Sequence, residues 1–212
     1  MFHLNKNKIV KHKQYNKGMT YVELIVVLGI FSLMSTVITF NYGFFQSKVD
    51  TKNLGNEIAL KIVEAQKAAL SGKLPTTTVP STWKPSYGIY FDSTNSNDSN
   101  DSIFFNKKFI YFTDLDSDGI YDGLPHCTTT ECLGKVSIPK GSYISAIQVF
   151  GTVSATPSNL TATFSRVNSG VNFTSNGTAL AGAVSYVQIT VISPKGGSAL
   201  IKIYPSGRVQ MN

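Results

Sequence analysis

The feature that most constrains this chain is an uncharged apolar stretch near its N-terminus. Residues 24–40 read LIVVLGIFSLMSTVITF and contain no charged side chain. A helix needs about 20 predominantly apolar residues to cross the hydrocarbon core of a bilayer. Residues 19–45 supply that length and carry one charge, Glu23, close to the start. The stretch therefore predicts a transmembrane helix.

A basic leader precedes the apolar stretch. Residues 1–18 contain no acidic residue and five lysines, namely Lys6, Lys8, Lys11, Lys13 and Lys17. The whole chain has 19 basic and 12 acidic residues and a net charge of +7; without the leader, 14 basic residues remain against 12, a net charge of +2. A polybasic segment directly before an apolar run is typical of the cytoplasmic flank of a membrane helix. A nucleic-acid-binding arm is the alternative.

Two ordinary targeting signals fit this region less well. A secretory signal peptide requires a small-residue cleavage site after the apolar region, whereas residues 41–45 read NYGFF. A simple signal anchor requires no particular sequence before the apolar run, and it leaves residues 17–23, KGMTYVE, without an explanation.

Residues 17–31, KGMTYVELIVVLGIF, resemble the processing motif of type IV prepilins: glycine, a hydrophobic residue, threonine, two apolar or aromatic residues, glutamate, then an apolar helix. The resemblance implies that a membrane-bound prepilin peptidase cuts after Gly18 on the cytoplasmic side and methylates the new amine of Met19. It also implies a single-pass protein of the inner (cytoplasmic) membrane with a cytoplasmic leader and an extracytoplasmic C-terminal domain. Other pilin subunits and an inner-membrane assembly platform would be its partners.

Glu23 is the unusual residue of this motif on physical grounds. A charged side chain at membrane depth costs about 2.5–3.5 kcal/mol on insertion scales, so a chain that keeps one there is expected to have a partner for it. The resemblance implies that the partner is the N-terminal amine of a neighbouring subunit and that the pair sets subunit register. The alternative is a carboxylate that reaches the lipid headgroups from near the helix end.

The helix is expected to continue beyond the membrane. Residues 46–71 contain no proline, and their apolar residues recur at three- and four-residue steps, which predicts one stripe that faces a core. The members of this stripe are Leu54, Ile58, Ile62, Ala65 and Ala69. Gly72 is a candidate helix cap, and Pro75 prevents continuation.

Residues 72–212 change to a period of two and predict a β-rich extracytoplasmic domain. Strands are expected at residues 87–92, 103–113, 143–150, 160–165, 170–174, 184–192, 198–204 and 207–211. Residues 194–197, PKGG, predict the turn between two of them. The expected fold class is α+β, with the long helix packed on an antiparallel sheet that has one solvent-facing side. This arrangement is also the pilin fold that the resemblance implies.

An acidic loop is the candidate metal site. Residues 114–123 read DLDSDGIYDG, and oxygen ligands at alternate positions with a glycine for the turn suit Ca²⁺. The expected ligands are Asp114, Asp116, Asp118, Asp122 and the carbonyl of Ile120. The loop begins like an EF-hand but has proline at the twelfth position. A solvated turn is the alternative, because Asp and Gly are common turn formers.

Two cysteines, Cys127 and Cys132, follow this loop. In an exported chain a close pair can form a disulfide, which we favour on the predicted compartment; two free thiols are the alternative.

The order YGIYFD, IYFTDLDSDGIYDG and IKIYPSGRVQM resembles the H-type minor pseudopilins of type II secretion and the fimbrial T-type minor pilins. The resemblance implies a structural subunit of a pilus or pseudopilus and no enzyme activity, and no catalytic motif is present in the sequence. The alternative is a fibre-tip subunit that binds DNA or a surface. Lys195, Lys202 and Arg208 are the basic residues near the C-terminus, and without a second arginine beside Arg208 DNA binding is doubtful.

Overall fold

The computed structural model describes residues 18–75, 86–97, 103–123, 125–167 and 170–212. The predicted leader therefore lies outside the described residues except for Gly18. The residues up to Tyr42 and those from Gly43 onward form two separate compact units.

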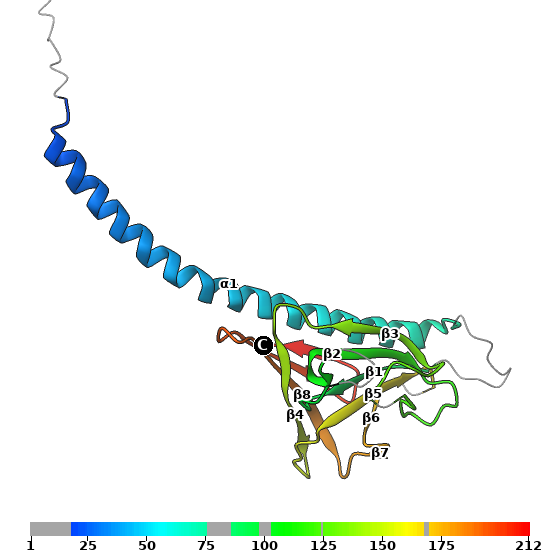
Figure 1. Ribbon diagram of the computed structural model, residues 1–212. Helices are drawn as coiled ribbons and strands as arrows, with labels where there is room; N and C mark the ends of the chain where they lie inside the picture. The colour runs from blue at the N-terminus through cyan, green and yellow to red at the C-terminus, as the bar shows by residue number, and fades with distance from the viewer. Residues whose placement is uncertain (1–17, 76–85, 98–102, 124, 168–169) are drawn as a thin grey trace, which may run out of the picture. The chain divides into compact units, whose positions relative to one another are not determined.

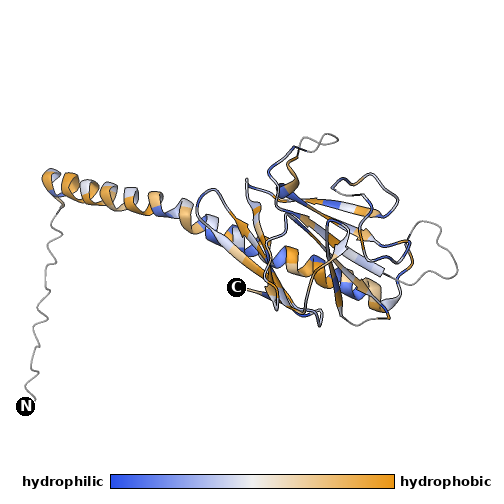
Figure 2. Cartoon of the chain, turned by 90° about the horizontal axis from the view of Figure 1, so that it is seen from below, coloured by the Kyte–Doolittle hydropathy of each residue, from blue (hydrophilic) through white to orange (hydrophobic). Residues whose placement is uncertain are grey.

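The first unit contains the beginning of helix α1, which runs from Tyr21 to Ser71. The side chains between Tyr21 and Tyr42 are almost all exposed, and Figure 2 shows this part of α1 as hydrophobic along its length. By length and composition, α1 is long and apolar enough to cross a membrane. The predicted long apolar helix near the N-terminus is confirmed.

In the second unit, the C-terminal half of α1 lies along the β-strands (Figure 1). The predicted stripe of Leu54, Ile58, Ile62, Ala65 and Ala69 is buried there. Small or polar residues extend this stripe, namely Ser47, Thr51, Gly55 and Ala68. Gly72 ends the helix as expected, with φ at +67°. Its N–H donates to the Ala69 carbonyl at 3.1 Å, and the Lys73 N–H donates to the Ala68 carbonyl at 3.0 Å. These two bonds form a Schellman motif.

Two antiparallel sheets complete the second unit. One has the order β3-β2-β1-β5-β6-β7 and the other β10-β9-β8-β4. The strands are β1 Ser86–Asp92, β2 Lys108–Thr113, β3 Cys132–Ser137, β4 Tyr143–Gly151, β5 Asn159–Ser165, β6 Val171–Ser175, β7 Thr178–Ala179, β8 Val184–Ile192, β9 Ser198–Ile203 and β10 Val209–Met211. A short 3-10 helix, η1, covers Phe105–Lys107. The α+β layout is thus as expected.

The predicted solvent-facing side is present on the sheet that contains β8 and β9, but the strands form two sheets where one was expected. The six-stranded sheet has no such side around β1. β1 is buried along its whole length, because both faces of the six-stranded sheet are covered around it. On one face Tyr87, Ile89 and Phe91 join the core that also includes the α1 stripe. On the opposite face Tyr90 packs with Ile110, Phe112 and Tyr121, so the chain segment that follows β2 folds back over the sheet.

Several strand boundaries also differ from the prediction. The segment expected as one strand over residues 103–113 contains η1 before β2 begins. The short strands β3 and β7 were not predicted. β3 contains no buried residue, and Leu133 points outward on it, so its hydrophobic alternation is weak. Its position at the sheet edge is set by pairing with β2.

Candidate functional site

The predicted processing site lies directly before α1. Gly18 and Met19 are exposed, with 64% of Met19 accessible. The Thr20 hydroxyl accepts a hydrogen bond from the Glu23 N–H at 3.3 Å, which makes Thr20 the N-cap of the helix. A threonine N-cap followed three residues later by glutamate is the capping-box pattern. The spacing T-x-x-E is the signal for this role in the sequence; the capping role of Thr20 was not predicted.

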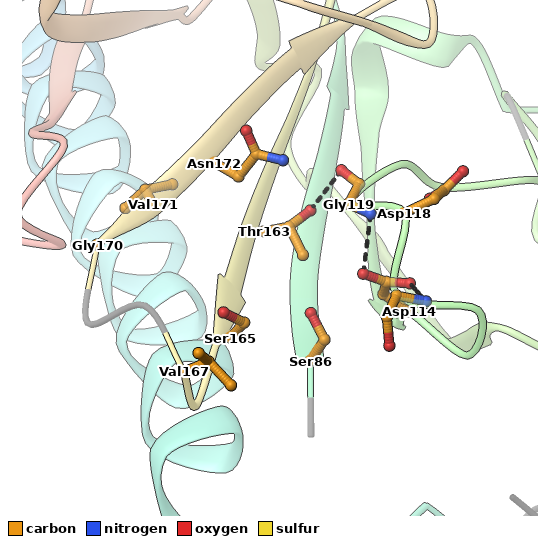
Figure 3. A pocket seen from close by; sticks show the side chains of 11 residues that line it. Ser86, Asp114, Asp118, Gly119, Thr163, Ser165, Val167, Gly170, Val171 and Asn172 are labelled. Carbon is orange, nitrogen blue, oxygen red and sulfur yellow. Dashed lines mark hydrogen bonds between the residues drawn. The ribbon is translucent and has the colours of Figure 1, made fainter. Parts of the chain in front are cut away.

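The acidic loop begins where β2 ends. Asp114 is 1% exposed, and its two carboxylate oxygens accept hydrogen bonds from the Ser117 N–H at 2.6 Å and the Gly119 N–H at 3.0 Å. Figure 3 shows this carboxylate beneath the turn that carries Gly119. The buried Asp114 therefore holds the loop closed from inside.

Three of the predicted ligands come together. One oxygen from each of Asp114, Asp116 and Asp118 lies within 4.8 Å of the other two. Asp116 and Asp118 are exposed, and each accepts a hydrogen bond from a backbone N–H two residues later, at 3.2 and 2.7 Å. Asp122 lies in the same loop but does not belong to this group. Ile120, which lies between Asp118 and Asp122 in the sequence, is half-buried.

Glu131 belongs to this site but was not among the predicted ligands. It is 4% exposed, and its carboxylate accepts hydrogen bonds from the Leu115 N–H at 2.8 Å and the Asp122 N–H at 3.0 Å. One side chain thus joins the start and the end of the acidic loop. The signal in the sequence is the single acidic residue inside the CTTTEC segment.

Cys127 and Cys132 form a disulfide in the structure, with their Cα atoms 5.4 Å apart. The small ring that they close contains Glu131, whose carbonyl accepts a hydrogen bond from the Thr113 N–H at 2.9 Å. The Tyr121 hydroxyl donates to the carbonyl of His126 just before the ring. The disulfide therefore limits the freedom of the segment that presents Glu131 to the loop.

Three carboxylates of the site, those of Asp114, Asp118 and Glu131, have a raised pKa. Burial raises the pKa of Asp114 to about 6, against the opposing effect of its hydrogen bonds from Gly119 and Ser117. Burial is also the main cause that raises the pKa of Asp118 and of Glu131, and neighbouring acidic groups add to it. Within the described part of the chain, no Lys or Arg forms an ion pair with Asp116, Asp118 or Asp122. A bound cation would relieve this repulsion.

A polar cavity of about 440 Å³ opens beside the loop. Figure 3 shows its walls, with Ser86 and Ser165 below the loop, Thr163 beside Gly119, and Asn172 on β6. The Thr163 hydroxyl donates to the Gly119 carbonyl at 3.0 Å. Gly119 has φ at +79°, and a Cβ there would collide with the Asn172 amide, so the tip of the loop requires glycine.

Comparison of the chain with protein-family models, with curated proteins and with solved structures finds no match.

Proposed function

We propose that this chain has a pilin fold and is a structural subunit, of the minor pilin or pseudopilin class, of a type IV pilus or a type II secretion pseudopilus. The observation that carries the proposal is the division within α1. The helix is apolar and exposed before Gly43, and it buries a regular stripe after Gly43. One helix with these two halves suits a subunit that is first anchored in lipid and then packed among other helices.

The exposed apolar half explains why assembly follows from membrane insertion. A helix that is hydrophobic all round has to be surrounded by lipid or by other apolar surfaces. If the subunit leaves the inner membrane, the helices of neighbouring subunits must replace the lipid. The proposed partners are therefore other pilin-like subunits, the prepilin peptidase and an inner-membrane assembly platform.

The proposal is tested at the mature N-terminus. The chain isolated from its own cells, analysed by mass spectrometry, is expected to begin at Met19 and to carry a methyl group on the Met19 amine. The reason is the motif from Gly18 to Glu23 directly before an N-capped apolar helix. An unprocessed N-terminus, or cleavage beyond residue 45, would contradict the proposal.

We also propose that the acidic loop binds Ca²⁺. Asp114, Asp116 and Asp118 converge, and Asp122 with the Ile120 carbonyl could complete an all-oxygen donor set of the kind that Ca²⁺ prefers. The raised pKa values of Asp114, Asp118 and Glu131 indicate negative charge that the protein itself neutralises poorly. A divalent cation supplies the missing positive charge.

Calcium is expected to raise the thermal stability of the full-length chain in detergent. A ligand that binds only the folded state at a hundredfold excess over its Kd adds about 2.7 kcal/mol to the free energy of unfolding. Circular dichroism of the β-sheet during heating, with Ca²⁺ and with chelator at pH 8, measures the effect. Asp116→Ala should abolish the shift, whereas Glu57→Ala, which removes an exposed carboxylate from α1, should retain it. Equal unfolding midpoints with Ca²⁺ and chelator would leave the loop as a solvated turn.

A further inference from the structure

The acidic residues of this chain are confined to one part of the sequence. All 12 acidic residues lie within residues 1–131. Residues 132–212 contain no acidic residue and have six basic ones: Lys135, Lys140, Arg166, Lys195, Lys202 and Arg208. The four-stranded sheet is built entirely from this acid-free part of the chain. The net charge of the whole chain hides this division.

One face of the four-stranded sheet is turned away from the core. Its inner side chains, such as Val187, Ile189 and Ile201, are fully buried, and α1 approaches that side so closely that a Cβ on Gly55 would meet Met211 at 2.9 Å. Side chains alternate across a strand, so the residues between the buried ones form an outer face. Most of them are half-buried or exposed.

Two rows of side chains cross this outer face. The strand register places Phe150, Tyr186, Tyr204 and Arg208 in one row and Gln148, Gln188, Lys202 and Gln210 in the next. In the first row the rings of Phe150 and Tyr186 stack at 4.6 Å between centroids. We call these two rows the basic sheet face.

Aromatic rings hold both cations of the basic sheet face in place. The Lys202 amine lies 5.0 Å from the centre of the Tyr186 ring, and the Arg208 guanidinium lies 3.9 Å from that of Tyr204. Neither cation has a carboxylate partner among the described residues. The face therefore presents fixed positive charge that the molecule does not neutralise.

The acidic loop is the complementary surface. Asp116, Asp118 and Asp122 are exposed and, like the two cations, have no oppositely charged partner among the residues described. The loop follows β2 of the six-stranded sheet, whereas the basic sheet face belongs to the other sheet. One molecule thus carries two different surfaces of opposite charge, and a contact between copies would pair unlike surfaces.

We propose that the basic sheet face of one molecule receives the metal-free acidic loop of a second copy through Lys202 and Arg208, so that this contact and Ca²⁺ compete for the same carboxylates. Contacts between two different surfaces are heterologous, and they generate an open filament where the rotation does not close a ring. This contact rests on the proposed function for its biological setting, in which copies of the subunit are neighbours in the fibre. Charge complementarity sets the register of the contact, and tethering by the membrane helix raises the effective concentration.

Single-stranded nucleic acid fits the same face less well. Such binding uses ring faces as platforms for bases together with a continuous basic groove. Here the rings are stacked on each other or lie under a cation, and the two rows contain two cations. The acidic loop of another copy requires neither a free ring face nor a long basic track.

Charge reversal in two matched variants tests the contact. The loop variant carries Asp116→Lys and Asp122→Lys; the face variant carries Lys202→Glu and Arg208→Glu. The full-length chain in detergent, at low salt and with chelator, is treated with a carbodiimide, which joins a carboxylate to an amine at contact distance. Mass spectrometry of the wild type should find the peptide with Lys202 joined to the acidic loop of another molecule.

Each variant alone should lose this cross-link, because the face variant lacks the reacting amine and the loop variant lacks two of the reacting carboxylates, and in both the facing charges are alike. The informative result is therefore the mixture. An equal mixture of the two variants should restore a cross-link between the reversed surfaces, because both of its contacts are again attractive. The control variant carries Arg166→Glu and Lys195→Glu, which make the same change in net charge as the face variant at exposed positions outside the basic sheet face. This control should give the wild-type cross-link.

Failure of the mixture to restore the cross-link would overturn the inference. So would a wild type that forms no Lys202 cross-link but binds a single-stranded oligonucleotide, with that binding lost in the face variant. These readouts do not depend on processing. A chain with an unmodified N-terminus but a rescued cross-link would therefore count against the proposed pilin function alone, and a methylated Met19 without rescue would count against the contact alone.

Discussion

Replacement of Gly18 by leucine is expected to leave the leader attached to nearly all of the chain. The proposed scissile bond follows Gly18, which has no Cβ and so allows close approach to the backbone. A leucine side chain would block that approach while leaving the apolar helix unchanged. Intact-mass measurement of membrane fractions should then find the precursor, heavier than the mature chain by the mass of residues 1–18.

Gly29→Leu is the matched control for this experiment. Gly29 lies in the apolar part of α1, and a Cβ there meets no atom within 4 Å in the structure. Leucine is also well suited to a membrane helix. This variant should be processed like the wild type. Normal processing of the Gly18→Leu chain would remove the basis for cleavage at this position.

Glu23→Val should reduce incorporation into the fibre by on the order of tenfold, which corresponds to about 1.4 kcal/mol. The expected loss is smaller than the about 2.5–3.5 kcal/mol that a charge costs at membrane depth, because the proposed pairing with the Met19 amine of a neighbour would also require desolvation. Membrane insertion and cleavage should be unaffected. Quantification of the subunit in sheared fibres against the membrane pool measures the effect.

The capping role of Glu23 requires a second variant. Glu23 occupies the third position after the N-cap Thr20, where glutamine serves a capping box as well as glutamate does. Glu23→Gln therefore preserves the helix start and removes only the charge. If ion pairing drives assembly, the glutamine variant should fail as the valine variant does. Normal incorporation of Glu23→Gln would assign the residue to helix capping.

The helix was the most predictable part of this protein. Its apolar half and its amphipathic half are both local patterns, and the stop at Gly72 depends on residues within one turn. Strands such as β8 and β9 were equally clear, because Val187 and Ile201 belong to uninterrupted alternations. Where the pattern was weak, as in β3, the prediction missed the strand.

The candidate metal site was only partly predictable. Alternating aspartates showed that residues 114–118 were chemically suited to a cation, and the structure brings three of those carboxylates together. The burial of Asp114 and the hydrogen bonds from Leu115 and Asp122 to Glu131 were not visible in the sequence. Both depend on the way in which Tyr121 packs the loop against Ile110 and Phe112.

The sequence by itself determined the long helix, the turn to β-structure and the positions of the charged residues, because each of these follows from neighbouring residues in the chain. Tertiary structure alone decided that the strands divide into two sheets and that the second face of β1 is covered. It also aligned Arg208 with Tyr204 and Lys202 with Gln188 on one surface. Strand register and sheet partners depend on contacts between residues far apart in the chain, which local periodicity does not encode.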